Sequence, residues 1–204
     1  MLLDLDDTLF DRTAAMRAWA DVAARAELGR PLSDIEWALL LEIDGRGHRP
    51  RDEFACDARD RLGLTVEAFG FGHVLVDHIV PEPGVVETLT ALAADKRVAI
   101  VTNGGTAQRA KLQRLGLDTI VHAVFVSGEI GSTKPALEIF DRALRWTEFD
   151  ASDVLFVGDD PVIDLAPSAS LGMATAWRAR GRVWPSELAP PTHRIESIPE
   201  LADL

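Results

Sequence analysis

The stretch MLLDLDDTLFD (residues 1–11) places three carboxylates directly after a short apolar run. Side chains alternate between the two faces of a β-strand, so we expect Asp4 and Asp6 on one face, about 7 Å apart at the backbone, and Asp7 on the other. Carboxylates this close repel each other by on the order of a few kcal/mol unless one binds a proton or a cation lies between them. The stretch therefore predicts a strand that ends at a cation-binding site.

Short apolar runs alternate with helical segments in the second part of the chain. The runs lie at 98–102, 123–127, 154–160 and 173–177, the last of which we expect to be the final strand. Helical patterns lie between them, one ending near Leu115 and another at 135–146. Uninterrupted apolar runs are typical of parallel strands covered by helices on both faces. The pattern predicts a Rossmann-like, three-layer α/β core with a central parallel sheet.

The segment between the first two strands has a different pattern. From Thr13 to about Ile79 apolar residues recur with helical spacing, and no strand pattern is evident. Ser33 and Glu36 form a capping-box pattern at one helix start, and 51–62 fits another helix followed by Gly63. We expect a small all-helical domain at 12–82, inserted into a core made of 1–11 and 83–204.

The composition of the chain limits the kinds of molecule that it is expected to bind. The chain has 204 residues, with 33 acidic against 21 basic residues and a net charge of −12, which argues against nucleic acid or an anionic membrane surface. The single cysteine can make no internal disulfide, no secretion leader is evident, and no apolar run approaches the ~20 residues of a membrane span. We expect a cytoplasmic protein; the sequence leaves its oligomeric state open.

Polar residues that follow the apolar runs are the candidates for chemistry. In an open α/β sheet, ligands bind beyond the carboxyl ends of the strands, so these residues are expected to meet at one edge of the sheet. They are Asp4, Asp6, Thr102, Asn103, Lys134, Asp159, Asp160 and Asp164. The set combines carboxylates, one hydroxyl, one amide and one ammonium group.

Four short motifs give these residues a family resemblance. DLDDT at 4–8, VTN at 101–103, KP at 134–135 and GDDPVID at 158–164 stand in the order and at the spacing of the motifs of the haloacid dehalogenase superfamily. The sequence resembles a hydrolase of this superfamily, and the helical segment occupies the place of the family's cap domain. Each motif alone is a weak signal, whereas four in order are a strong one.

The resemblance implies a role for each residue. Asp4 would be the nucleophile that forms an aspartyl-phosphate, and Asp6 the acid and base that serves the leaving oxygen and the attacking water. Lys134 would balance negative charge, while Thr102 and the backbone N–H groups of Asn103 and Gly104 would cradle the phosphate. Mg²⁺ would be held by Asp4, the backbone carbonyl of Asp6 and Asp159, with Asp160 and Asp164 as possible outer contacts.

Within the superfamily the resemblance favours phosphoryl transfer. Carbon–halogen cleavage releases a halide that needs no proton, so an acid at Asp6 would have no task there. We expect a Mg²⁺-dependent phosphatase that acts on a small phosphorylated metabolite, a nucleoside monophosphate or a sugar phosphate. A phosphomutase of the same fold and a silent binding protein remain alternatives. A glycoside hydrolase using paired carboxylates would leave Lys134 and Thr102 unexplained.

A loop in the helical segment gathers positive charge in an acidic chain. DGRGHRP at 44–50 contains Arg46, His48 and Arg49. We expect these three side chains to contact the non-phosphate portion of an anionic or hydroxylated substrate. The alternative is a solvated loop with no contact to substrate.

Overall fold

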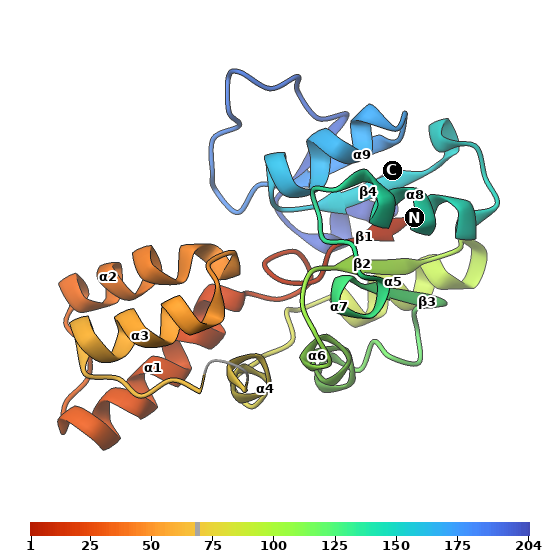
Figure 1. The fold of residues 1–204 in the computed structure, drawn as a ribbon. Helices are drawn as coiled ribbons and strands as arrows, with labels where there is room; N and C mark the ends of the chain where they lie inside the picture. Colours follow the sequence, from red (N-terminus) through yellow and green to blue (C-terminus); the bar gives the residue numbers. More distant parts are fainter. Residues whose placement is uncertain (68–69) are drawn as a thin grey trace. The chain divides into compact units, whose positions relative to one another are not determined.

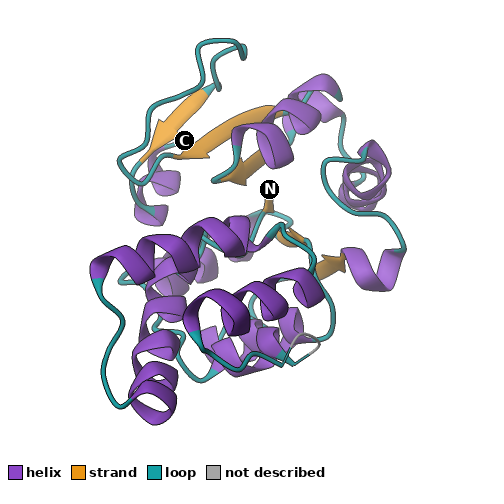
Figure 2. Cartoon of the chain, turned by 60° about the vertical axis from the view of Figure 1, so that its left-hand side comes forward, coloured by secondary structure: helices purple, strands orange, loops and turns teal. Residues whose placement is uncertain are grey.

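The computed structural model describes residues 1–67 and 70–204, which divide into two compact units. Met1–Asp11 and Pro81–Leu204 form one unit, called the core below, and Arg12–Val80 forms the other, called the helical unit. Figures 1 and 2 show strands in the core and helices alone in the described part of the helical unit. The sequence analysis predicted the boundaries of the helical domain after residues 11 and 82.

A parallel sheet lies at the centre of the core. Within the described residues it has six strands in the order β3-β2-β1-β4-β5-β6. The strands are β1 (Leu2–Leu3), β2 (Ala99–Thr102), β3 (Ala123–Val126), β4 (Leu155–Gly158), β5 (Ala174–Arg178) and β6 (His193–Ile195). The short strand β1 is central: Leu2 pairs with Ala99 on one side and Phe156 on the other. The prediction of a Rossmann-like parallel sheet is confirmed.

Helices flank this sheet, as Figure 1 shows. They are α5 (Val85–Asp95), α6 (Ala107–Leu115), α7 (Ser127–Ile130), α8 (Leu137–Thr147) and α9 (Ala166–Ser170), with short 3₁₀ turns η2 (Ala151–Asp153) and η4 (Ile198–Asp203) and a π-helical turn η3 (Pro161–Leu165). Apolar residues of α8 and the strands form a shared cluster in which the rings of Phe140 and Phe156 lie 5.1 Å apart. Burial of this apolar surface is the main favourable contribution to the stability of the core.

The prediction that 173–177 is the final strand is wrong. β6 follows it and pairs with β5 through His193, Arg194 and Ile195. An edge strand of three residues with one apolar side chain carries too little hydrophobic alternation for a sequence pattern to reveal it.

The helical unit has its own hydrophobic core. Its described elements are α1 (Arg12–Leu28), α2 (Asp34–Asp44), the 3₁₀ turn η1 (Gly45–Gly47), α3 (Arg51–Leu62) and α4 (Phe71–Val76). Phe71 packs against Trp19 and Phe54, with ring centroids 4.8 and 5.0 Å apart. The predicted capping box at Ser33 and Glu36 is present in full, and it provides partners for backbone N–H groups that the first turn of α2 leaves unpaired.

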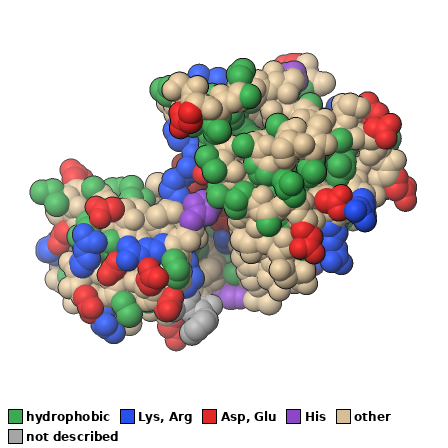
Figure 3. All heavy atoms as spheres, turned by 45° about the horizontal axis from the view of Figure 1, so that its top comes forward, with side chains coloured by type: hydrophobic (Ala, Val, Ile, Leu, Met, Phe, Trp, Pro, Cys, Tyr) green, Lys and Arg blue, Asp and Glu red, His purple; other side chains and the backbone are tan. Residues whose placement is uncertain are grey.

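Exposed charges on the helical unit are mixed in sign. Figure 3 shows basic and acidic side chains interspersed over its surface, and ion pairs such as Arg17–Asp21 at 3.6 Å and Arg59–Asp60 at 2.8 Å join some of them. Exposed pairs of this kind contribute little stability each.

Among the described residues, none of the helices has the length and hydrophobicity that a bilayer crossing would require.

Candidate active site

The strand order of the sheet places two acidic residues side by side. β1 lies between β2 and β4, so the connections after β1 and after β4 diverge at this point, where open α/β sheets bind ligands. Asp4 directly follows β1, and its backbone N–H donates to the carbonyl of Val157 in β4 at 2.9 Å. Asp159 directly follows β4. The ladder between β1 and β4 therefore brings the two side chains to one edge.

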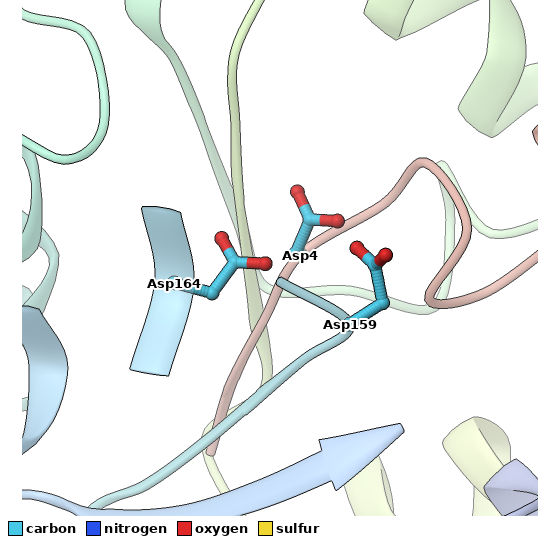
Figure 4. Close-up of side chains that lie close together, drawn as sticks. All are labelled: Asp4, Asp159 and Asp164. Carbon is cyan, nitrogen blue, oxygen red and sulfur yellow. The ribbon is translucent and has the colours of Figure 1, made fainter. Parts of the chain in front are cut away.

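A third carboxylate completes a buried cluster. Oxygen atoms of Asp4, Asp159 and Asp164 lie within 4.8 Å of one another, and all three residues are buried. Figure 4 shows the three carboxylates directed toward a common space. Oxygen ligands at this spacing are the donor set that Mg²⁺ prefers, so these residues fit a magnesium site.

Lys134 enters the same cluster with a positive charge. Its Nζ donates to Asp4 Oδ1 at 2.6 Å and to Asp164 Oδ1 at 2.7 Å, and its side chain is 2% exposed. The Asn103 side chain holds the backbone of Lys134 from both sides: Nδ2 donates to the Lys134 carbonyl at 2.9 Å, and the Lys134 N–H donates to Oδ1 at 2.8 Å. Asn103 thus connects the end of β2 to the loop that supplies the ammonium group.

Burial and neighbouring charges shift the pKa of both Asp4 and Lys134. Burial raises the pKa of Asp4 to about 6; Asp164 and Asp6 add to the rise, and Lys134 opposes it. Burial works against the Lys134 ammonium, but the carboxylates of Asp164 and Asp4 outweigh it and raise the pKa of Lys134 above its usual value. Lys134 is therefore a permanent cation, while Asp4 takes up a proton in mild acid.

Asp159 has partners that the sequence did not reveal. Arg182 Nη2 donates to the Asp159 carboxylate at 3.1 Å and to its backbone carbonyl at 2.9 Å. The indole Nε1 of Trp177 donates to the same carbonyl at 3.0 Å. The segment after β5 thus orients one of the three acids. The alternating arginines of RARGR at 178–182 are the sequence signal that could have identified it.

The predicted outer contacts Asp160 and Asp164 are used differently. Asp160 caps the turn η3, where its Oδ1 accepts from the N–H groups of Val162 and Ile163 at 2.9 Å each. Asp164 lies in the carboxylate cluster itself, and its Oδ2 accepts from the N–H of Asp160 at 3.2 Å. A side chain at Gly158 would collide with Asp164, because a Cβ there would lie 2.6 Å from the Asp164 Cβ.

The Asp6 carboxylate takes a different set of partners from that of Asp4. β1 ends at Leu3 and Asp7 adopts a left-handed conformation with φ 57°, so strand alternation does not extend to Asp6. The Asp6 carboxylate accepts from Lys111 Nζ at 2.5 Å and from Gln108 Nε2 at 2.6 Å. The sequence identified neither partner, although both are polar residues on the buried face of α6.

The predicted phosphate-binding residues follow β2. Thr102 is buried at the end of the strand, and its Oγ1 accepts from Gln108 Nε2 at 2.6 Å. The N–H of Gly104, predicted to contact phosphate, donates instead to Ser127 Oγ at 3.0 Å. The N–H of Gly128 donates to the Gly104 carbonyl at 2.9 Å, so this glycine joins the ends of β2 and β3.

The loop with Arg46, His48 and Arg49 is anchored inside the helical unit. Asp44 is 1% exposed and accepts from Arg12 at 2.7 and 2.9 Å, from Arg51 at 3.0 Å and from the N–H of Gly47 at 2.8 Å. Burial opposes its charge, but the guanidinium groups prevail and lower the pKa of Asp44. Arg49 pairs with Asp57 at 2.6 Å and Glu53 at 3.4 Å. This loop is therefore ordered by its own unit.

Gly158→Ala tests whether the close packing behind Asp164 maintains the cluster. We expect a loss of about 1–3 kcal/mol in unfolding free energy, the usual cost of overpacking, because Asp164 must move away from Lys134. Gly105→Ala is the matched control, since a Cβ there meets no atom within 4 Å. Equal melting temperatures for the two variants would contradict the packing argument.

The burial of Asp4 predicts a pH-dependent stability of the metal-free protein. Its pKa rises on folding from the usual 3.8 to about 6. The stability that protonated Asp4 contributes is complete below pH 3.8 and is lost as the pH rises through about 6. Measured in EDTA, the unfolding free energy of the unmodified protein relative to Asp4→Asn should fall by up to ~3 kcal/mol across this interval. A difference that does not change with pH would count against the shift.

Comparisons with known proteins identify the family of the chain. The model of the haloacid dehalogenase-like hydrolases matches residues 1–172. The pyrimidine 5'-nucleotidase YjjG of Escherichia coli is 36% identical over 137 residues, which cover 66% of this chain and 60% of that protein. The ribulose-1,5-bisphosphate 5-phosphatase of Halopiger xanaduensis is 35% identical over 176 residues, covering 80% of this chain and 68% of that protein.

A solved structure shows the same fold. The magnesium-bound HAD-hydrolase YfnB from Bacillus subtilis aligns with a TM-score of 0.81 and 25% identity, covering 99% of this chain and 96% of that one. The predicted enzyme class, a hydrolase of phosphoric monoesters, agrees with the names of the curated relatives. The family model matches most of the sequence, and the fold and motifs described above agree with it. The chain therefore belongs to the haloacid dehalogenase-like hydrolases.

Proposed function

We propose that the protein is a Mg²⁺-dependent phosphomonoesterase that works through an aspartyl-phosphate on Asp4. The observation that carries the proposal is the buried cluster of Asp4, Asp159 and Asp164 with the Lys134 ammonium between two of its members. Asp4 and Asp159 would hold the metal together with the backbone carbonyl of Asp6. The bound ion would neutralise phosphoryl charge and orient the substrate.

The first half-reaction transfers the phosphoryl group to the protein. The Asp4 carboxylate attacks phosphorus, a P–O bond to Asp4 forms, and the bond to the leaving oxygen breaks. Asp6 gives its proton to that oxygen, so an alcohol leaves. Lys134 stays bonded to Asp4 Oδ1, which fixes the direction of the nucleophile and balances charge on the phosphoryl oxygens.

The second half-reaction restores the enzyme. Asp6, now a carboxylate, takes a proton from water, and the resulting hydroxide attacks phosphorus and releases Asp4 and inorganic phosphate. We infer that Thr102, at the end of β2, donates its hydroxyl to a phosphoryl oxygen. One carboxyl group thus serves both steps, which is why the separate anchoring of Asp6 by α6 matters to the proposal.

The alternatives differ in what accepts the phosphoryl group. A phosphomutase would use the same residues but return the phosphoryl group to a sugar, and a silent binding protein would transfer none. The nucleotidase and sugar-bisphosphatase names of two relatives favour hydrolysis. They also support a nucleoside monophosphate or a sugar phosphate as substrate. We infer a cytoplasmic site of action from the composition alone.

Phosphate release from a panel of phosphomonoesters tests the proposal. We expect release with Mg²⁺, none with EDTA, and a return of activity when Mg²⁺ is restored. Asp4→Asn should reduce release to the level of buffer, because an amide cannot serve as the nucleophile. Asp118→Asn is the control: it changes an exposed carboxylate on the surface of the same unit and should leave the rate unaltered. Turnover that persists in Asp4→Asn would exclude the covalent route.

The loop of the helical unit supports a second prediction about substrate choice. If Arg49 contacts a second anionic group of the substrate, Arg49→Ala should lower kcat/KM for a sugar bisphosphate by about tenfold or more, the usual value of a charge-assisted contact. Hydrolysis of p-nitrophenyl phosphate, which lacks that group, should be unchanged. Arg59→Ala removes an exposed arginine of α3 and serves as the control. Equal kcat/KM values in all three proteins would favour the solvated-loop alternative.

A further inference from the structure

Helix α6 directs two buried polar side chains at Asp6. Gln108 is 3% exposed and Lys111 is 5% exposed, and they lie three residues apart on the helix. Gln108 Nε2 donates to Asp6 Oδ2 at 2.6 Å, and Lys111 Nζ donates to Asp6 Oδ1 at 2.5 Å. Each carboxylate oxygen therefore has a separate donor from the same helix, which defines the plane of the carboxylate.

The Gln108 amide has a second acceptor. The same Nε2 donates to Thr102 Oγ1 at 2.6 Å, so one NH₂ group bridges the carboxylate of Asp6 and the hydroxyl of Thr102. A carboxylate accepts only, so the amide nitrogen and not its oxygen must face Asp6. Because Thr102 Oγ1 accepts from Gln108, the hydroxyl uses its own hydrogen as a donor. It donates to the Asn103 carbonyl at 3.5 Å, a long bond that a nearer acceptor would replace.

The backbone beside Gln108 is shaped to admit this side chain. Gly104 has φ +139°, and a Cβ at this position would lie 2.9 Å from Gln108 Cγ. Any residue other than glycine would push the amide away from Thr102. The turn that carries Asp6 is held together by an isolated β-bridge between Asp6 and Phe10. Lys111 also contacts this turn, with its Nζ 5.8 Å from the Phe10 ring centroid.

We propose that Gln108 is a positioning residue for phosphoryl transfer. Its amide fixes the Asp6 carboxylate relative to the Thr102 hydroxyl, and Lys111 binds the second oxygen of Asp6. This inference rests on the proposed phosphatase function. A carboxylate has about four acceptor positions, so two bonds from α6 leave capacity for the proton exchanged with the leaving oxygen. With substrate bound, the Thr102 hydroxyl would exchange its long bond to the Asn103 carbonyl for a bond to a phosphoryl oxygen, while Gln108 holds its oxygen in place.

Substrates with different leaving groups separate this role from a structural one. Departure of an alkoxide needs a proton from Asp6, whereas p-nitrophenolate leaves without one. Gln108→Met keeps the length of the side chain but removes both hydrogen bonds. The second half-reaction is the same for both substrates, so the comparison uses kcat/KM, which reports on the steps up to departure of the leaving group. We expect kcat/KM of the variant for the best alkyl phosphomonoester to fall about 10–100-fold further than its kcat/KM for p-nitrophenyl phosphate, in the range of a misplaced general acid.

Gln113→Met is the matched control, because Gln113 is exposed on the same helix. Its kinetics should equal those of the unmodified protein on both substrates. Gln108→Glu is a second test that retains the shape of glutamine but places a carboxylate against Asp6; it should show the same selective loss, and it decides the question if Gln108→Met does not fold.

The outcomes distinguish this inference from the function on which it rests. If the unmodified protein hydrolyses neither substrate, the proposed function fails first. If it hydrolyses both and the Gln108 variants lose kcat/KM equally on both, the role of Gln108 is structural and the inference is overturned. Unchanged kcat/KM on the alkyl ester in a folded variant would overturn it as well.

Discussion

The buried ion pairs of Lys134 are the constraint on which the rest of the core depends. Carboxylates at Asp4 and Asp164 lose their hydration on folding, and a single desolvated carboxylate is costly. One ammonium group bonded to both makes their burial tolerable, so the residue after β1 (Asp4), the turn bearing Asp164 and the loop bearing Lys134 must meet at one point. The side chain of Asn103 ties this loop to β2.

The same arrangement explains why the cluster attracts a cation. Two carboxylates share the single charge of Lys134, so these three groups together carry a net negative charge once Asp4 is ionised. Burial weakens the screening of that charge by water. An anionic substrate would be repelled by the cluster alone, whereas a divalent cation would be attracted to the oxygens that Lys134 leaves accessible. Cation binding and phosphate binding are therefore expected to be coupled.

Much of this arrangement could be predicted from the sequence, and the remainder shows where sequence patterns stop. Apolar runs identified β2 to β5, and the motifs identified the family, because these features are local. The sequence did not identify Gln108, Lys111 and Arg182. Each binds an acidic residue that is distant in the sequence, and such a contact leaves no local spacing to recognise. For Gln108 and Lys111 the signal was their position on the apolar face of α6, beside Leu112 and Leu115.

Asp6 shows most clearly why a strand pattern does not extend into a loop. Strand alternation predicted that Asp4 and Asp6 share one face, but the strand ends at Leu3, and Asp6 is only a minor contributor to the raised pKa of Asp4. The orientation of Asp6, however, follows from a turn in which Asp7 has positive φ and from two donors more than a hundred residues away. The group that we propose to give and take a proton is held by tertiary contacts, because the backbone turn that carries it has no periodicity of its own.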